Sequence, residues 1–255
     1  MLNVVHYPSP SSATPLVIAH GLYGSARNWG AIARSLSDRG PVFAVDHRNH
    51  GQSPWYATHL YEDLAQDLAA VIEANAAGPV DLLGHSMGGK AAMTLALSQP
   101  HLVHRLIVAD IAPVKYGHDQ IEYIQAMQAL DLSDRPKRSE VESRLRSGLG
   151  DPMLASFFSQ SYDPATGAWR LNLDVLARDM PAILGFPEVS ATFAGPTLFL
   201  SGGMSDYVRP EHREIIKRHF PAALLLKIPG AGHWLHAEKP QEFSATVRHW
   251  LDRSE

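Results

Sequence analysis

The stretch VDLLGHSMGGKAAM (residues 80–93) holds the pattern that decides the fold. Its apolar start ends in glycine, which is typical of a buried strand, and a helix is expected from residue 89. Between them, GHSMG matches G-x-S-x-G, in which the serine lies on a tight strand-to-helix turn. Any side chain at Gly84 or Gly88 would collide with the neighbouring turn. The pattern therefore predicts that the Ser86 hydroxyl stands clear of the sheet at a helix N-terminus, where the helix dipole favours developing negative charge.

Similar apolar runs recur along the chain and alternate with helix-like segments. Continuous apolar strands separated by helices predict a mostly parallel, twisted sheet flanked by helices. Residues 114–189 break this rhythm, because they hold several helical stretches and no strong buried strand. We therefore expect one core, residues 1–113 and 190–255, with a helical lid, residues 114–189, inserted between core strands above the ligand crevice. The other strands are expected within residues 15–21, 42–51, 105–113, 196–203 and 223–230.

Composition excludes several classes of protein. The 255 residues are 45% hydrophobic and 19% charged, as in soluble globular domains. A formal net charge of −4 leaves no broad basic field for nucleic acid or an anionic membrane. The absence of cysteine excludes disulfides, thiolate zinc sites and a cysteine nucleophile. With no visible signal peptide or membrane-spanning run, we expect a cytoplasmic protein, either a monomer or a homodimer.

A serine hydroxyl is a weak nucleophile and needs a base. His233, in PGAGHW, follows the last expected strand and fits the chain order serine, acid, histidine. His236 is a nearby rival. His47 and His50, in DHRNHG, could be interpreted as a metal pair, but no carboxylate cluster accompanies them, so we expect no metal and a turn-stabilising role.

The base needs a carboxylate to orient it, and two candidates remain open. Asp110 follows a strand in VADIAP, and Asp206 follows a later strand in SGGMSDYVRP. Both could lie at the catalytic edge of the sheet. From the residues alone, Asp206 is favoured.

Acyl transfer also needs two donors for an oxyanion. The backbone N–H groups of Met87 and of Leu22, in HGLYGS (residues 20–25), are the candidates. We expect the substrate-binding pocket to involve His20, Tyr23, His85, Phe157, Phe158 and Trp234.

Five motifs in order, HGLYGSARNW, DHRNHGQS, GHSMGGKAAM, DIAPVKY and GAGHWLHAEKP, carry a resemblance to a known family. The chain resembles the α/β-hydrolase family of the YbfF-type bacterial esterases and abhydrolase domain-containing protein 11. The resemblance implies the α/β-hydrolase fold, an esterase or thioesterase without a cofactor, and short acyl esters or acyl-CoA thioesters as substrates. It also implies that Asp110 is the acid and that Ser205 assists near the histidine, so we favour Asp110 over Asp206, which is a departure from the family pattern.

The sequence thus predicts a serine carboxylesterase or thioesterase that acts on a small-molecule ester or thioester through a Ser-His-Asp triad and an acyl-enzyme. A serine at the turn argues against dehalogenases and epoxide hydrolases, which carry aspartate there. A C–C bond hydrolase, a lactonase or a perhydrolase would keep the same residues. A non-catalytic receptor for a small ligand would also be compatible with the motifs.

Overall fold

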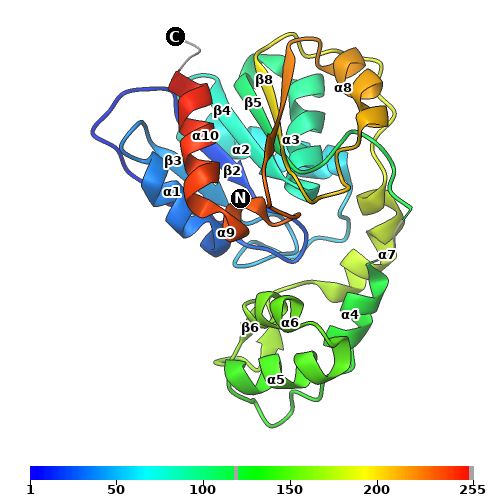
Figure 1. The fold of residues 1–255 in the computed structure, drawn as a ribbon. Coiled ribbons are helices and arrows are strands. Elements are labelled where there is room, and N and C mark those ends of the chain that lie inside the picture. Colours follow the sequence, from blue (N-terminus) through cyan, green and yellow to red (C-terminus); the bar gives the residue numbers. More distant parts are fainter. Residues whose placement is uncertain (118–119, 253–255) are drawn as a thin grey trace.

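A computed structural model describes residues 1–117 and 120–252. Its core is a seven-stranded sheet in the order β1-β3-β2-β4-β5-β8-β9 (Figure 1). Only β1 runs antiparallel to its neighbour, and the other pairings are parallel. The predicted mostly parallel sheet is therefore confirmed. Its strands are β1 (Val4–Tyr7), β2 (Leu16–Ala19), β3 (Val42–Val45), β4 (Val80–His85), β5 (Val103–Ala109), β8 (Thr197–Gly202) and β9 (Ala223–Ile228).

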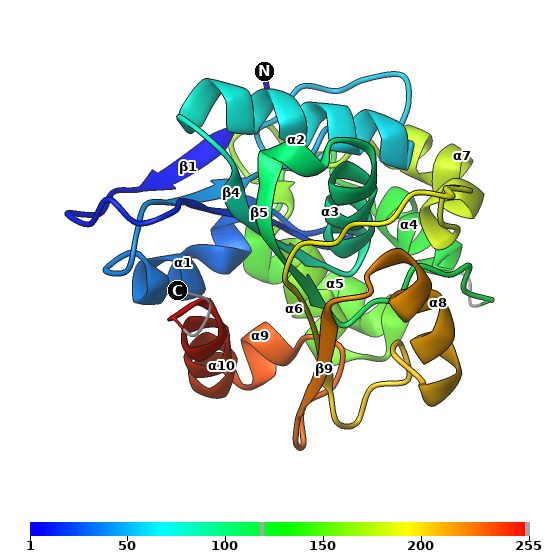
Figure 2. The same cartoon turned by 90° about the horizontal axis from the view of Figure 1, so that it is seen from above.

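Helices cover both faces of this sheet, as Figure 2 shows from above. One face packs against α1 (Gly30–Leu36) and α10 (Pro240–Asp252), and the other against α2 (Tyr61–Asn75), α3 (Met87–Ser98) and α8 (Arg213–His219). Successive residues of β4 point to opposite faces of the sheet: Leu82 belongs to one buried hydrophobic cluster and Leu83 to the other. Because both faces are buried, the strands read as continuous apolar runs rather than alternating ones.

The segment between β5 and β8 projects away from the core on the side of α9 (Leu235–Glu238) (Figure 1). Its elements are α4 (Ile121–Gln128), α5 (Arg138–Leu149), α6 (Pro152–Ser159), α7 (Leu173–Leu184) and a short antiparallel pair, β6 (Tyr162–Asp163) and β7 (Ala168–Trp169). The pair was not expected, because two-residue strands leave no periodic signal. Short 3-10 helices η1 (Ala26–Trp29), η2 (Pro100–Leu102) and η3 (Pro210–His212) complete the fold. No helix in residues 1–117 or 120–252 is both long and apolar enough to cross a membrane.

The turn after β4 is as tight as the sequence pattern requires. Ser86 has φ 53° and ψ −122°, a conformation that costs a non-glycine residue about 1–3 kcal/mol. A Cβ at Gly84 would lie 2.2 Å from the carbonyl oxygen of Gly88, and a Cβ at Gly88 would lie 2.4 Å from the carbonyl oxygens of Ala19 and His20. The two glycines thus allow β4, α3 and the end of β2 to approach closely enough to hold Ser86 in its strained conformation.

We expect Gly84→Ala to destabilise the protein by about 1–3 kcal/mol or more, because the added methyl group must push the backbone of α3 aside. Urea denaturation measures this loss. Gly78→Ala is the matched control, since nothing lies within 4 Å of its added Cβ. Equal unfolding free energies for the two variants would contradict the proposed role of the close contact.

Candidate active site

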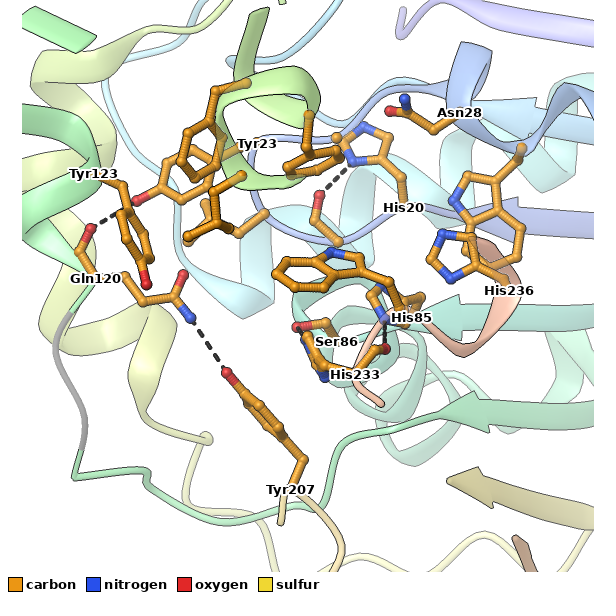
Figure 3. Close-up of a pocket in the computed structure, with 18 residues that line it drawn as sticks. His20, Tyr23, Asn28, His85, Ser86, Gln120, Tyr123, Tyr207, His233 and His236 are labelled. Atoms are coloured by element: carbon orange, nitrogen blue, oxygen red, sulfur yellow. Dashed lines mark hydrogen bonds between the residues drawn. The ribbon is translucent and has the colours of Figure 1, made fainter. Parts of the chain in front are cut away.

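Ser86 and His233 face each other where the carboxyl ends of β4 and β9 open toward the lid. Ser86 lies between the end of β4 and the first residue of α3, and His233 lies between β9 and α9. The Oγ of Ser86 is 3.1 Å from Nε2 of His233. Figure 3 shows both side chains in the pocket, with Gln120 and Tyr123 to one side and Asn28 and His236 to the other. At 3.1 Å, Nε2 of His233 is close enough to accept the proton of the Ser86 hydroxyl.

Asp110 is the carboxylate that meets the imidazole. Its Oδ2 lies 2.8 Å from Nδ1 of His233, and its side chain is fully buried after the end of β5. The backbone N–H of Gly202 donates to Oδ1 over 2.9 Å, and the Ser205 hydroxyl donates to Oδ2 over 2.5 Å. These donors stabilise the charged carboxylate and fix its orientation.

Asp206 does not make the contact that the acid must make. Its side chain is exposed, and its backbone carbonyl accepts a hydrogen bond from Nε of Arg209. The turn after β8 brings Ser205 to Asp110 instead. The preference for Asp206 from residue types alone is thus not supported by the geometry, because the direction of a side chain in that turn depends on how β8 lies against β5.

The two candidate oxyanion donors border one small space beside the nucleophile. Leu22, Ser86 and Met87 together line a cavity of about 20 Å³. Met87 is the first residue of α3, so its N–H has no intrahelical acceptor. Among the residues that the structure describes, the backbone N–H groups of Leu22 and Met87 form no hydrogen bond. Both donors are therefore available to a ligand.

A larger cavity of about 220 Å³ extends from Ser86 toward the lid. All six expected pocket residues line it: His20, Tyr23, His85, Phe157, Phe158 and Trp234. Two of them also have structural contacts, since Nδ1 of His20 bonds to the Gly21 carbonyl and Nε2 of His85 to the His233 carbonyl. The walls are mostly aromatic, which suits the apolar part of a small ligand.

Sequence reasoning missed several residues of this pocket, among them Gln120 and Tyr207. The Tyr207 ring stacks on His233, with centroids 3.9 Å apart and an interplanar angle of 18°. Burial raises the pKa of Tyr207 to about 12, so it stays a neutral phenol. Its position two residues after Ser205 is a signal that could have found it. Nothing in the sequence distinguishes Gln120, which reaches the site through the packing of the lid.

The rival base, His236, lines the same pocket, but His233 is the histidine that contacts Ser86. His236 is buried and stacks on Trp29 with centroids 4.1 Å apart. His47 and His50 are fully buried, and Nδ1 of His50 donates to the Arg48 carbonyl. No group of three or more His, Cys, Asp or Glu side chains in the described part of the chain could hold a metal ion.

The buried histidines make the fold sensitive to acid. Burial lowers the pKa of His20, His47, His50, His59, His85 and His236, to about 3 for His59 and His236. A native pKa below the unfolded value means that the unfolded state binds more protons below about pH 6.5. Stability is therefore fully present above that pH and is lost as the pH falls toward 3.

We expect His236→Phe, which keeps an aromatic ring against Trp29, to weaken this dependence. The difference in unfolding free energy between pH 7 and pH 5 should shrink by about 2 kcal/mol, because one buried imidazole no longer has to stay neutral. Urea denaturation at the two pH values measures it. His249→Phe, at an exposed site of α10, is the control and should leave the difference unchanged. An unchanged difference in His236→Phe would show that His236 does not contribute.

The comparisons with known proteins agree with this geometry. The family model for the alpha/beta hydrolase fold matches residues 14–240. The sn-1-specific diacylglycerol lipase ABHD11 of Danio rerio is 40% identical over 94% of this chain and 79% of its own length. Esterase YbfF of Escherichia coli is 37% identical over 94% of this chain and 93% of its own. A solved structure of a marine microorganism esterase superposes with a TM-score of 0.92 at 37% identity and covers 98% of both chains.

These matches extend across the core and the lid, and the resemblance inferred from the motifs is confirmed. The chain belongs to the α/β-hydrolase family and is one of its esterase/lipase-type members.

Proposed function

We propose that this protein is a serine carboxylesterase, also active on thioesters, that cleaves small acyl esters through an acyl-enzyme on Ser86. The observation that carries the proposal is the continuous chain of contacts from Ser86 Oγ through the His233 imidazole to Asp110, at 3.1 and 2.8 Å. The relatives named as esterases and lipases support the same class of reaction.

In the first step, Ser86 Oγ attacks the carbonyl carbon of the ester while His233 Nε2 takes the hydroxyl proton. The carbonyl oxygen becomes an oxyanion, which the Leu22 and Met87 N–H groups stabilise. Collapse of this intermediate breaks the bond to the leaving alcohol or thiol, which receives the proton from His233. Water then attacks the acyl-enzyme with the same base, and the carboxylic acid leaves.

Asp110 stabilises the imidazolium that forms in each step and keeps the proton-bearing Nδ1 turned toward itself. Ser205 assists from the other side, because it donates to the same carboxylate oxygen, Oδ2. Tyr207 restricts tilting of the His233 ring by stacking on it. These three side chains therefore position the base without contacting the reacting carbonyl.

The pocket favours small acyl groups. A volume of about 220 Å³ bounded by Phe157, Phe158 and Tyr123 accommodates a short chain and leaves little room for a bulky one. A thioester presents a carbonyl of similar size, so the same contacts serve it.

A fluorophosphonate probe tests the proposal directly, because it phosphonylates only an activated serine. We expect labelling at Ser86, mapped by peptide mass spectrometry, together with turnover of p-nitrophenyl butyrate and release of thiol from butyryl-CoA. Labelling without turnover of either substrate, or of a panel of lactones, would instead indicate a receptor. The absence of labelling at Ser86 would refute the proposal.

A further inference from the structure

Four buried histidines lie next to one another behind the loop that carries the Leu22 N–H. The ring of His20 is 4.8 Å from that of His47 and 5.2 Å from that of His50, and His50 is 5.2 Å from His59. The reaction described above uses none of them as a base. Since no metal-binding group exists among the described residues, the cluster needs another explanation.

His20 holds one of the two peptide groups that flank the Cα of Leu22. Its Nδ1 lies 2.8 Å from the carbonyl oxygen of Gly21, and its Nε2 accepts from the backbone N–H of His47 over 3.0 Å. The Gly21 carbonyl and the Leu22 N–H belong to the same planar trans peptide, so they point in opposite directions. A donor on the carbonyl therefore aims the N–H away from His20 and toward the space beside Ser86.

His50 holds the second peptide group. The backbone N–H of Tyr23 donates to Nε2 of His50 over 3.2 Å, and Nδ1 of His50 donates to the Arg48 carbonyl over 3.0 Å. Tyr23 has φ +63°, a left-handed conformation that costs a non-glycine residue about 1–2 kcal/mol. An acceptor on its N–H stabilises this conformation. The two contacts therefore restrain both peptide groups beside the Cα of Leu22.

The contacts also define the protonation state of both rings. A carbonyl oxygen can only accept and a backbone N–H can only donate, so each ring carries its proton on Nδ1 and presents a bare Nε2. Burial and the neighbouring imidazoles lower the pKa of His50 well below its usual range, which keeps Nε2 free to accept. A charged imidazolium would lose the bond to Tyr23.

We propose that His50 is a positioning residue that, together with His20, orients the Leu22 N–H toward the oxyanion and acts only as the neutral Nδ1–H tautomer. The inference rests on the proposed function, because it assigns a role to His50 in the same reaction. The His50 segment also pairs with the lid: His50 bridges to Leu171, and the Asn49 carbonyl accepts from the Asn172 N–H over 3.0 Å. The position of the Leu22 N–H therefore depends on how the lid packs against the His50 segment.

His50→Leu removes the acceptor for the Tyr23 N–H. It is expected to lower kcat for p-nitrophenyl butyrate about 10- to 100-fold, with KM changed less than about 3-fold, because the contact between the Leu22 N–H and the oxyanion forms only in the transition state. His50→Gln, whose amide oxygen can accept, should recover part of kcat. His101→Leu, at an exposed site, is the matched control. Thermal unfolding of each variant reports whether the fold is intact.

A trifluoromethyl ketone separates positioning from a general structural effect. Ser86 Oγ adds to its carbonyl carbon, the proton passes to His233, and the resulting oxyanion occupies the Leu22 and Met87 donors. Its inhibition constant should rise in His50→Leu by the same factor by which kcat/KM falls, and recover in His50→Gln. Equal kcat in His50→Leu and wild type, or an unchanged inhibition constant, would overturn the proposal.

The wild-type protein supplies a test that does not depend on the folding of any variant. Nitrogen-15 NMR of the imidazoles at pH 7 should show Nδ1 protonated and Nε2 bare for His50 and His20, and the opposite tautomer for His50 would also overturn the proposal. Failure of the proposed function looks different: the wild type itself would then show neither labelling at Ser86 nor turnover.

Discussion

Ser86→Ala is expected to lower kcat/KM for p-nitrophenyl butyrate by about 10⁵- to 10⁶-fold. The substitution removes the atom that forms the acyl-enzyme, so hydrolysis is left with only the direct attack of water. The oxyanion donors and the pocket remain, which leaves a residual acceleration of about 10³-fold over the uncatalysed reaction.

His233→Ala should cost about as much as Ser86→Ala. It removes the base that lies 3.1 Å from the Ser86 hydroxyl, and without that base the hydroxyl is not deprotonated at neutral pH. The double variant should lose little more than either single one, since the two side chains act as a unit. Steady-state kinetics with fluorophosphonate titration of active sites measures both effects. His249→Ala, on the exposed side of α10, is the control. Wild-type turnover in Ser86→Ala would show that the hydrolysis proceeds elsewhere.

The six parallel strands and the turn at Ser86 could be predicted because their signals are local, whereas the antiparallel edge strand β1, which has no fully buried residue, was missed. Burial on both faces leaves unbroken apolar runs, and the collision at Gly84 involves residues within one turn of the chain. The lid was predictable only as a break in this rhythm, so the strands β6 and β7 were missed.

The site was predictable where a side chain follows a strand and not where it depends on packing between distant segments. Ser86 and His233 both lie just beyond strand ends, and such ends converge at one edge of a parallel sheet. The choice between Asp110 and Asp206 required the direction of the turn after β8, which the residues alone do not specify. Gln120 and Tyr207 touch each other across 87 positions of sequence, so only the folded chain brings them together.

Asp110→Asn is expected to lower kcat by about 10⁴-fold while Ser86 and His233 stay in place. An amide can present its NH₂ group to Nδ1 of His233, which then has to act as the acceptor and carries its proton on Nε2. That tautomer has no lone pair facing the Ser86 hydroxyl, and the imidazolium loses the charge that stabilises it. The Gly202 N–H needs an acceptor at the Oδ1 position, so it favours the amide orientation that turns the NH₂ group toward His233 and Ser205.

Asp206→Asn is the matched control and should change kcat by less than about 3-fold, because its exposed carboxylate makes no contact with His233 and surface charges interact weakly through water. The pH dependence adds a second criterion: activity of Asp110→Asn should rise at alkaline pH, where hydroxide can take over from His233, whose Nε2 carries a proton and cannot act as the base. Ser205→Ala should fall between the two, since it removes one donor of 2.5 Å but leaves the carboxylate bonded to Gly202 and His233. If Asp206→Asn lost more activity than Asp110→Asn, the acid would have to reach the imidazole in a different arrangement of the β8 turn. The order of the three variants thus measures how much of the reaction depends on the charge at Asp110 and how much on the hydrogen bonds that hold it.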